Sequence, residues 1–238
     1  MSWTHRLHRG KIWSMKTPEL SPPEQRRATG ALLVLGPVVY LLGEFTAAAA
    51  WTNPPYSYTY HFISNLGVRG PSELFGQFML SPLAWVMNSA FFLFGIITWC
   101  GFVSLRGLSG WRRVLVLTTA TMLAVGGVLL ALNPGSAEAM EHGSGHALGA
   151  MAAFIGGNTL AIAMGRMHQR VGLSTTLGKV LVACGSVGLC AMVGYFADLA
   201  SGLNLLLGLV ERAIVYPFLA GIICIGATAW SRRTSSAH

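Results

Sequence analysis

Charged residues are scarce in this chain. Asp, Glu, Lys and Arg make up 10% of its 238 residues, whereas hydrophobic residues make up 53%. A typical soluble domain contains about 25% charged residues. Because so few charges cannot cover a water-facing surface, the composition excludes an ordinary soluble domain and predicts that lipid surrounds most of the chain.

The patterns of two reactive residue types, cysteine and lysine, also narrow the possible chemistry. The four cysteines lie in apolar segments without CxxC spacing, which argues against a disulfide framework and a thiol redox motif. No lysine lies in the interior of an apolar segment, which argues against a retinal Schiff base. The net charge of +8 does not indicate nucleic-acid binding, because the basic residues stand between apolar runs, where they determine membrane topology.

Six apolar segments are present, each long enough to cross about 30 Å of hydrocarbon as a helix of about 20 residues. We therefore expect an all-α membrane protein, a six-helix bundle within residues 29–230. A basic tail, 1–28, precedes it and a short tail, 231–238, follows it. The predicted spans are 29–50, 82–104, 113–132, 147–165, 179–199 and 212–230.

The basic residues predict the orientation of the bundle. All Lys and Arg residues except Arg69 and Arg212 fall in the two tails or in the loops on the same side. Basic residues of short loops stay in the cytoplasm. Both termini are therefore expected in the cytoplasm.

The first outer loop, 51–81, is the longest, and we expect it to carry a short interfacial helix. Tyr56, Tyr58 and Tyr60 alternate along it beside His61. Such rings are typical of the headgroup level of a membrane, where they form an aromatic belt. The alternative is a lid or re-entrant segment that closes over a pocket from outside.

The second outer loop contains a possible metal site. His142 and His146 are spaced i, i+4, which on a helix places both imidazoles on one face and suits zinc. The candidate ligands are His61, Glu141, His142 and His146, although the glycines around His142 weaken a helix there. The alternative is that these histidines form ordinary hydrogen bonds between helices.

Several polar residues are expected near the outer ends of the spans. Glu44 and Asn88 lie at a similar depth of about 10 Å, at about 1.5 Å of helix rise per residue. Glu44 has no cationic partner on its own span, and we expect Asp198 to pair with Arg212 across the last hairpin. Ionisable groups at membrane depth usually face the bundle interior. The sequence thus predicts an outward-facing polar cavity, with candidate ligand-binding residues Glu44, His61, Ser64, Asn65, Asn88, His146, Asp198 and Arg212.

Three short motifs resemble a known family. They are Ile63-Ser64-Asn65-Leu66-Gly67, then His146-Ala147-Leu148-Gly149-Ala150 with Gly157-Asn158, and Gly208-Leu209-Val210-Glu211-Arg212 with Tyr216-Pro217. In these the chain resembles the prokaryotic integral-membrane domain-of-unknown-function family 998. The resemblance implies a bundle of six to seven helices in a prokaryotic plasma membrane, with no established activity. The acidic residue usual after Ile-Ser in that family is Asn65 here, so no carboxylate stands at that position.

Three functions are compatible with the sequence. The first is a binding or transport-accessory protein whose cavity receives a lipid or other amphiphile. The second is an intramembrane metal-dependent lipid hydrolase that uses His61, His142 and His146, with Glu44 or Glu141 as general base for a metal-bound water. The third is a structural subunit of a larger membrane complex. The expected partners are the lipid bilayer and, in the third case, another membrane protein, but no nucleic acid.

Overall fold

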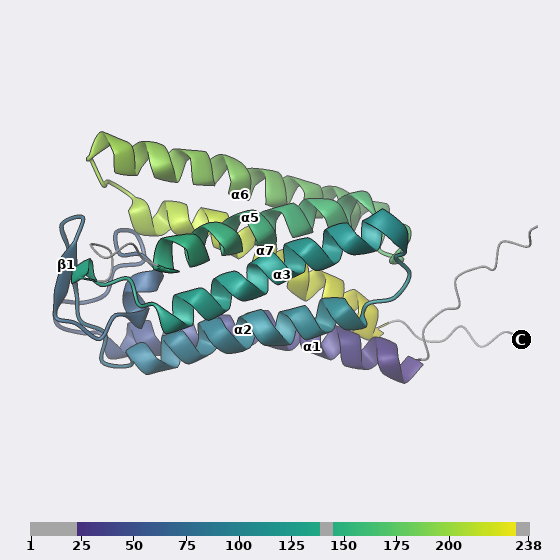
Figure 1. The fold of residues 1–238 in the computed structure, drawn as a ribbon, viewed down its shortest axis with the longest axis horizontal. Helices are drawn as coiled ribbons and strands as arrows, with labels where there is room; N and C mark the ends of the chain where they lie inside the picture. The colour runs from purple at the N-terminus through teal and green to yellow at the C-terminus, as the bar shows by residue number, and fades with distance from the viewer. Residues whose placement is uncertain (1–22, 139–144, 232–238) are drawn as a thin grey trace, which may run out of the picture.

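A computed structural model describes residues 23–138 and 145–231, and six of its helices are long and apolar enough to cross a membrane. They run side by side as one bundle (Figure 1). The predicted six-helix membrane architecture is therefore confirmed. The helices are α1 (Pro23–Ala50), α2 (Ala84–Ser104), α3 (Gly110–Leu132), α5 (Gly145–Arg166), α6 (Thr175–Ser201) and α7 (Leu207–Ser231).

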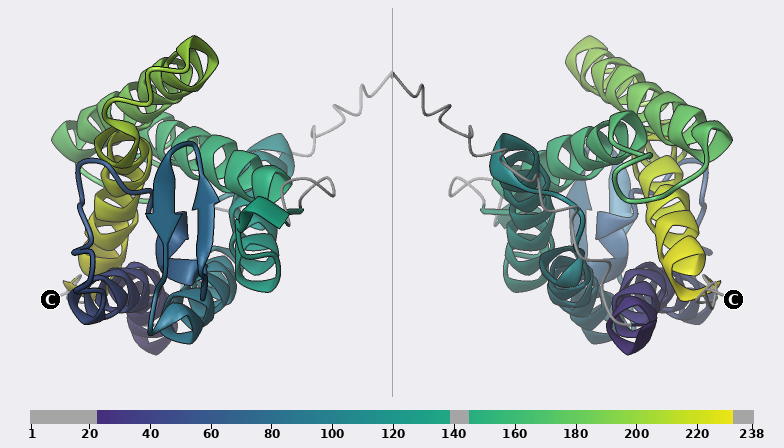
Figure 2. Two further views of the ribbon diagram at one scale, coloured as in Figure 1. Left: turned by 90° about the vertical axis from the view of Figure 1, so that its left-hand side faces the viewer. Right: turned by 90° about the vertical axis from the view of Figure 1, so that its right-hand side faces the viewer.

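The helices form a closed ring. Each packs against the next along the chain, and α7 returns to pack against α1, while α5 also contacts α7 across the ring. Seen end-on, α6 projects from the rest of the bundle (Figure 2). Only 17% of its membrane-spanning window is buried, against 44% or more in the other five helices. Most of the α6 surface is therefore exposed to lipid.

Small residues set the distance between α3 and α5. A Cβ on Gly126 of α3 would lie 2.5 Å from the backbone nitrogen of Ala153 and 2.6 Å from the carbonyl oxygen of Gly149, both on α5. Real side chains do not approach so closely. The glycine thus allows the two backbones to pack in direct contact, as is common between helices in lipid.

Residues 51–83, which we call the roof, join α1 to α2. They cover one end of the bundle, and the first residues of α1 and the last residues of α7 lie at the other end (Figure 1). The expected interfacial helix is not confirmed. The roof contains a four-residue 3₁₀ helix, η1 (Ser64–Gly67), whose Asn65 and Leu66 are buried. It also contains an antiparallel hairpin of β1 (Ser72–Leu74) and β2 (Gln77–Met79), which the sequence analysis did not anticipate.

The backbone conformation of the two turn residues accounts for the hairpin. Phe75 and Gly76, between the strands, both have positive φ, at 51° and 72°. Two such residues are typical of a type I′ turn, whose twist matches that of paired strands. The second strand is buried at Gln77 and Met79, so the hairpin is part of the roof's packing and not a free loop.

Candidate functional site

A buried ion pair joins α1 to α7 beneath the roof. Glu44 is completely buried and Arg212 is 5% exposed. The Nη2 and Nε atoms of Arg212 donate to Oε1 of Glu44 over 2.9 and 3.1 Å, and the Tyr216 hydroxyl donates to the same oxygen over 2.8 Å. Within the described residues this is the only ion pair closer than 4 Å, and Oε2 of Glu44 has no partner there.

The same arginine also forms hydrogen bonds to the roof. Its Nη1 atom donates to the carbonyl oxygens of Tyr58 (2.8 Å), His61 (3.2 Å) and Gly208 (2.9 Å), and its Nη2 atom donates to the Tyr56 hydroxyl (2.6 Å). The guanidinium carbon lies 4.7 Å from the centre of the Tyr58 ring. All three nitrogens of Arg212 are thus engaged, and one side chain links α1, α7 and the roof.

The first turn of α7 forms a second attachment to the roof. The backbone N–H of Ile63 donates to Oε2 of Glu211 over 2.5 Å, and the N–H of Leu209 donates to the carbonyl oxygen of Thr59 over 3.0 Å. A Cβ on Gly208 would lie 2.9 Å from the carbonyl oxygen of Tyr58. The close contact between helix and roof therefore requires a glycine at this position.

Aromatic side chains of the roof surround the arginine. The Tyr56 hydroxyl donates to the carbonyl oxygen of Phe62 over 2.9 Å, and burial raises the pKa of Tyr56 above its usual value. The His61 ring stacks against both Trp51 and Tyr56, which also contact each other, and its Nδ1 accepts from the backbone N–H of Ser57 over 2.8 Å. Burial, and then the charge of Arg212, lower the pKa of His61, so this imidazole is neutral near pH 7.

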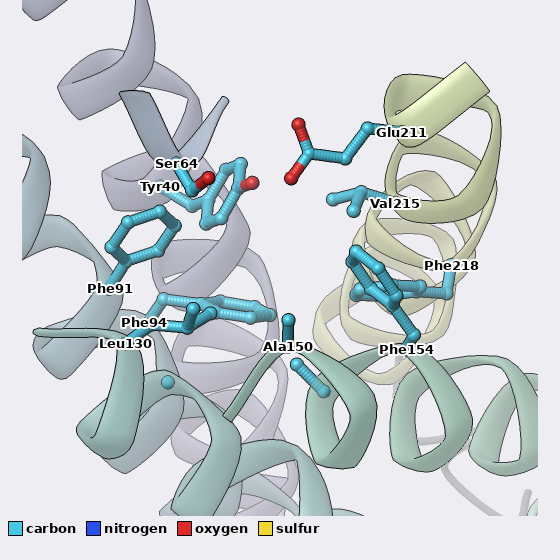
Figure 3. A pocket seen from close by; sticks show the side chains of 12 residues that line it. Tyr40, Ser64, Phe91, Phe94, Leu130, Ala150, Phe154, Glu211, Val215 and Phe218 are labelled. Carbon is cyan, nitrogen blue, oxygen red and sulfur yellow. The ribbon is translucent and has the colours of Figure 1, made fainter. Parts of the chain in front are cut away.

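An enclosed cavity of about 30 Å³ lies next to this network, in the middle of the bundle. One side is polar: Figure 3 shows the hydroxyls of Ser64 and Tyr40 and the carboxylate of Glu211 directed toward one another. The other walls are apolar and include four phenylalanine rings. The lining residues are Tyr40, Ser64, Phe91, Phe94, Gly127, Leu130, Ala150, Ala153, Phe154, Glu211, Val215 and Phe218.

The structure brings only part of the predicted site together. Ser64 lines the cavity, and Glu44, Arg212 and His61 belong to the adjoining network. Asn65 points elsewhere, since its side-chain amide donates to Oε1 of Gln77 over 2.6 Å.

Asn88, on α2, donates to the carbonyl oxygen of Gly67 over 3.0 Å and lines a groove on the outside of α2 and α3. His146, at the start of α5, contacts the carbonyl oxygen of Asn133 through Nδ1 at 2.9 Å. Neither residue lines the enclosed cavity. A cavity shared by Glu44, Asn88, His146 and Arg212 therefore stays a prediction, distinct from the enclosed cavity described above.

The predicted ion pair between Asp198 and Arg212 is wrong. Oδ1 of Asp198 accepts from the backbone N–H of Leu205 over 3.3 Å and closes the turn between α6 and α7. Arg212 points into the bundle and pairs with Glu44 instead. The true cationic partner of Glu44 lies 168 residues away along the chain.

The zinc hypothesis is tested only in part. Glu141 and His142 lie outside the described residues. Among residues 23–138 and 145–231, no group of three or more His, Cys, Asp or Glu side chains gathers as a metal site would require. His61 and His146 each use one ring nitrogen in a backbone contact, and metal binding by either stays a prediction.

Three residues of the network and the cavity were not among the predicted site residues: Tyr40, Glu211 and Tyr216. A usable signal was present: Tyr40 and Glu44, like Arg212 and Tyr216, are four residues apart and so share a helix face. Glu211 was missed because the sixth span was expected to begin at residue 212. Helix α7 begins at Leu207, which places Glu211 inside the bundle.

The three sequence motifs meet at this site. Ser64 of the first, Ala150 of the second and Glu211 of the third all line the cavity, and Arg212 holds the network beside it. No curated protein and no solved structure matches the chain. The model of the family described as "Protein of unknown function (DUF998)" matches residues 34–228, so the chain belongs to this family of membrane proteins.

Proposed function

We propose that this protein binds a lipid or other amphiphile, whose polar headgroup occupies the cavity beneath the roof. The supporting observation is the cavity itself, an enclosed space in an apolar bundle with three polar side chains gathered on one side. Pockets for whole ligands are larger, at about 300–1,000 Å³, but they share this combination of mostly apolar walls and a few converging polar groups. The cavity is therefore assigned only to the polar end of the ligand.

The surroundings of the cavity are compatible with an acyl chain outside the bundle. A groove of about 340 Å³ runs along α2 and α3 and is lined by Asn88, Ser89, Phe92, Leu93, Ala131 and Leu132. The neighbouring residues Phe91 and Leu130 line the cavity on the inner side of the same helices. The groove and the cavity are thus lined by neighbouring residues of the same two helices, which is compatible with a tail in the groove and a headgroup in the cavity.

The orientation in the membrane is part of the proposal. Following the distribution of basic residues, the roof faces the outside of a prokaryotic plasma membrane and both termini face the cytoplasm. Reporter fusions after Arg69 should report the outside, and fusions after Arg112 and Lys179 the cytoplasm. A reversed result at two of these positions would contradict the orientation.

Photolabelling tests the binding proposal. Purified protein in nanodiscs of neutral lipid is irradiated with dodecanol that carries a diazirine near its hydroxyl, and labelled peptides are identified by mass spectrometry. We expect labelling of the cavity-lining stretches around Phe91 and Phe154. The substitution Ala150→Leu fills the cavity and should reduce this labelling by about tenfold. The matched Ala183→Leu on the exposed face of α6 should not.

The proposal fails if the probe labels only lipid-facing peptides, or if Ala150→Leu and Ala183→Leu give the same pattern. The metal-dependent hydrolase with His61, His142 and His146, and the structural subunit of a larger complex, stay alternatives. No described contact favours either of them over amphiphile binding.

A further inference from the structure

The chemistry of the ligand is indicated by the one carboxylate that faces the cavity. Glu211 is only 6% exposed, and one of its oxygens accepts a hydrogen bond from Ile63. Figure 3 shows its carboxylate directed into the cavity, toward the hydroxyls of Tyr40 and Ser64. Within the described residues, neither hydroxyl donates or accepts a hydrogen bond.

No cation of the described chain neutralises this carboxylate. Arg212 follows Glu211 directly, but its guanidinium is committed to Glu44, to Tyr56 and to three backbone carbonyls. The ion pair of Arg212 with Glu44 is the only one within 4 Å in the described part of the chain. A charged group buried in a membrane is strongly unfavourable unless it is paired. Glu211 therefore requires either a bound proton or a cation in the cavity.

The walls of the cavity favour a cation. Five aromatic rings line it, and the face of such a ring attracts an ammonium group electrostatically, more strongly where water is excluded. An ammonium group has three N–H donors, which matches the three oxygen-bearing side chains Glu211, Ser64 and Tyr40.

The size of the cavity limits the choice further. A volume of about 30 Å³ holds on the order of two water molecules. A primary ammonium with its first methylene fits such a space. A trimethylammonium group adds three methyl groups and does not fit without opening the packed walls.

We propose that the ligand is an amphiphilic primary amine whose ammonium group enters the cavity, with Glu211 as its counterion and the hydroxyls of Ser64 and Tyr40 as acceptors. This inference rests on the proposed function, because it names the headgroup that the cavity receives.

Three photoreactive probes with the same chain and diazirine position test it: dodecylamine, dodecyltrimethylammonium and dodecanol. Neutral-lipid nanodiscs prevent the amines from concentrating on an anionic surface, and labelling of the α6 peptides corrects for background. In the wild-type protein we expect the amine to label the cavity peptides about tenfold more than either other probe. Glu211→Gln should remove this preference and leave dodecanol labelling within about twofold.

Glu73→Gln, on the exposed β1 strand, is the matched control and should keep the wild-type preference. Equal labelling by amine and alcohol in the wild-type protein, or an amine preference that survives Glu211→Gln, would overturn the inference and leave Glu211 as a protonated, neutral residue. If Glu211→Gln does not fold, the ratio among the three probes on the wild-type protein decides. If no probe labels the cavity, the proposed function itself fails, so the two failures are distinguishable.

Discussion

Two helix junctions of this bundle are built in opposite ways. Between α3 and α5, Gly126 allows backbone to touch backbone, and the stabilisation comes from close packing. Between α1, α7 and the roof, Glu44 and Arg212 bury opposite charges, and Arg212 donates two hydrogen bonds to Glu44 and further ones to the roof. The first junction needs only small residues. The second places costly polar groups in one buried region, where ionisable residues in membrane proteins usually indicate function.

The largest expected effect follows from breaking the polar junction. Arg212→Met leaves Glu44 as a buried charge without a cationic partner and removes the donors that hold three backbone carbonyls. The free energy of unfolding in detergent or nanodiscs should fall by about 3–5 kcal/mol. The control Arg106→Met changes an exposed arginine and should stay within about 0.5 kcal/mol of wild type. A similar small effect for Arg212→Met would contradict the role given to the ion pair.

A single added carbon between α3 and α5 should lower the free energy of unfolding. Gly126→Ala places a Cβ against the backbone of α5, and overpacking of this kind costs about 1–3 kcal/mol. Gly194→Ala on α6 is the matched control, since no atom lies within 4 Å of the added Cβ. It should stabilise the helix by about 0.5–1 kcal/mol because glycine is the poorer helix former. The two substitutions should therefore change the unfolding free energy in opposite directions.

The partner of Arg212 can be checked separately. Because Asp198 closes a turn and does not pair with Arg212, Asp198→Asn should change the free energy of unfolding by no more than about 0.5 kcal/mol. In combination with Arg212→Met, the two losses should add. A coupling energy above about 1 kcal/mol between these positions would restore the pair that the sequence suggested.

The smallest effect concerns pH. The pKa of His61 is lower in the folded protein than its usual value of about 6.5, so the unfolded chain binds the proton more tightly. The stability contributed by the neutral ring is therefore complete above about pH 6.5 and is lost as the pH falls below that value. Thermal unfolding from pH 8 to pH 5 should show this decline in wild type and a weaker one in His61→Gln. Equal declines would exclude His61 as the titrating group.

The hydropathy of the sequence was sufficient to predict the six-helix fold, but it did not predict where every helix begins. The predicted spans end at Ala50, Ser104 and Leu132, as α1, α2 and α3 do. Helix α7, however, begins five residues before the predicted start at residue 212. Its first turns carry Glu211 and Arg212, whose polarity lowers the hydropathy of a stretch that is nevertheless buried.

Part of the site could be selected from the sequence, but the pairing of its residues could not. Glu44 and Arg212 were both selected, because charges are rare in membrane spans. Their pairing depends on which face each helix turns toward its neighbour, and that is decided by the packing of all six helices. Glu211 and Arg212 are adjacent in sequence, but about 100° of helix rotation separates their side chains. One faces the cavity and the other faces Glu44.

The central claim is that the two buried glutamates have different roles, Glu44 as the partner of Arg212 and Glu211 as the free carboxylate of the cavity. The free energies of unfolding of Glu44→Gln and Glu211→Gln, measured side by side without added ligand, test it most directly. Glu44→Gln leaves Arg212 unpaired and should cost about 3–5 kcal/mol. Glu211→Gln keeps an oxygen to accept from Ile63, removes a group that requires a proton or a cation, and should leave stability unchanged or raise it. Equal losses in the two variants would contradict this division of roles.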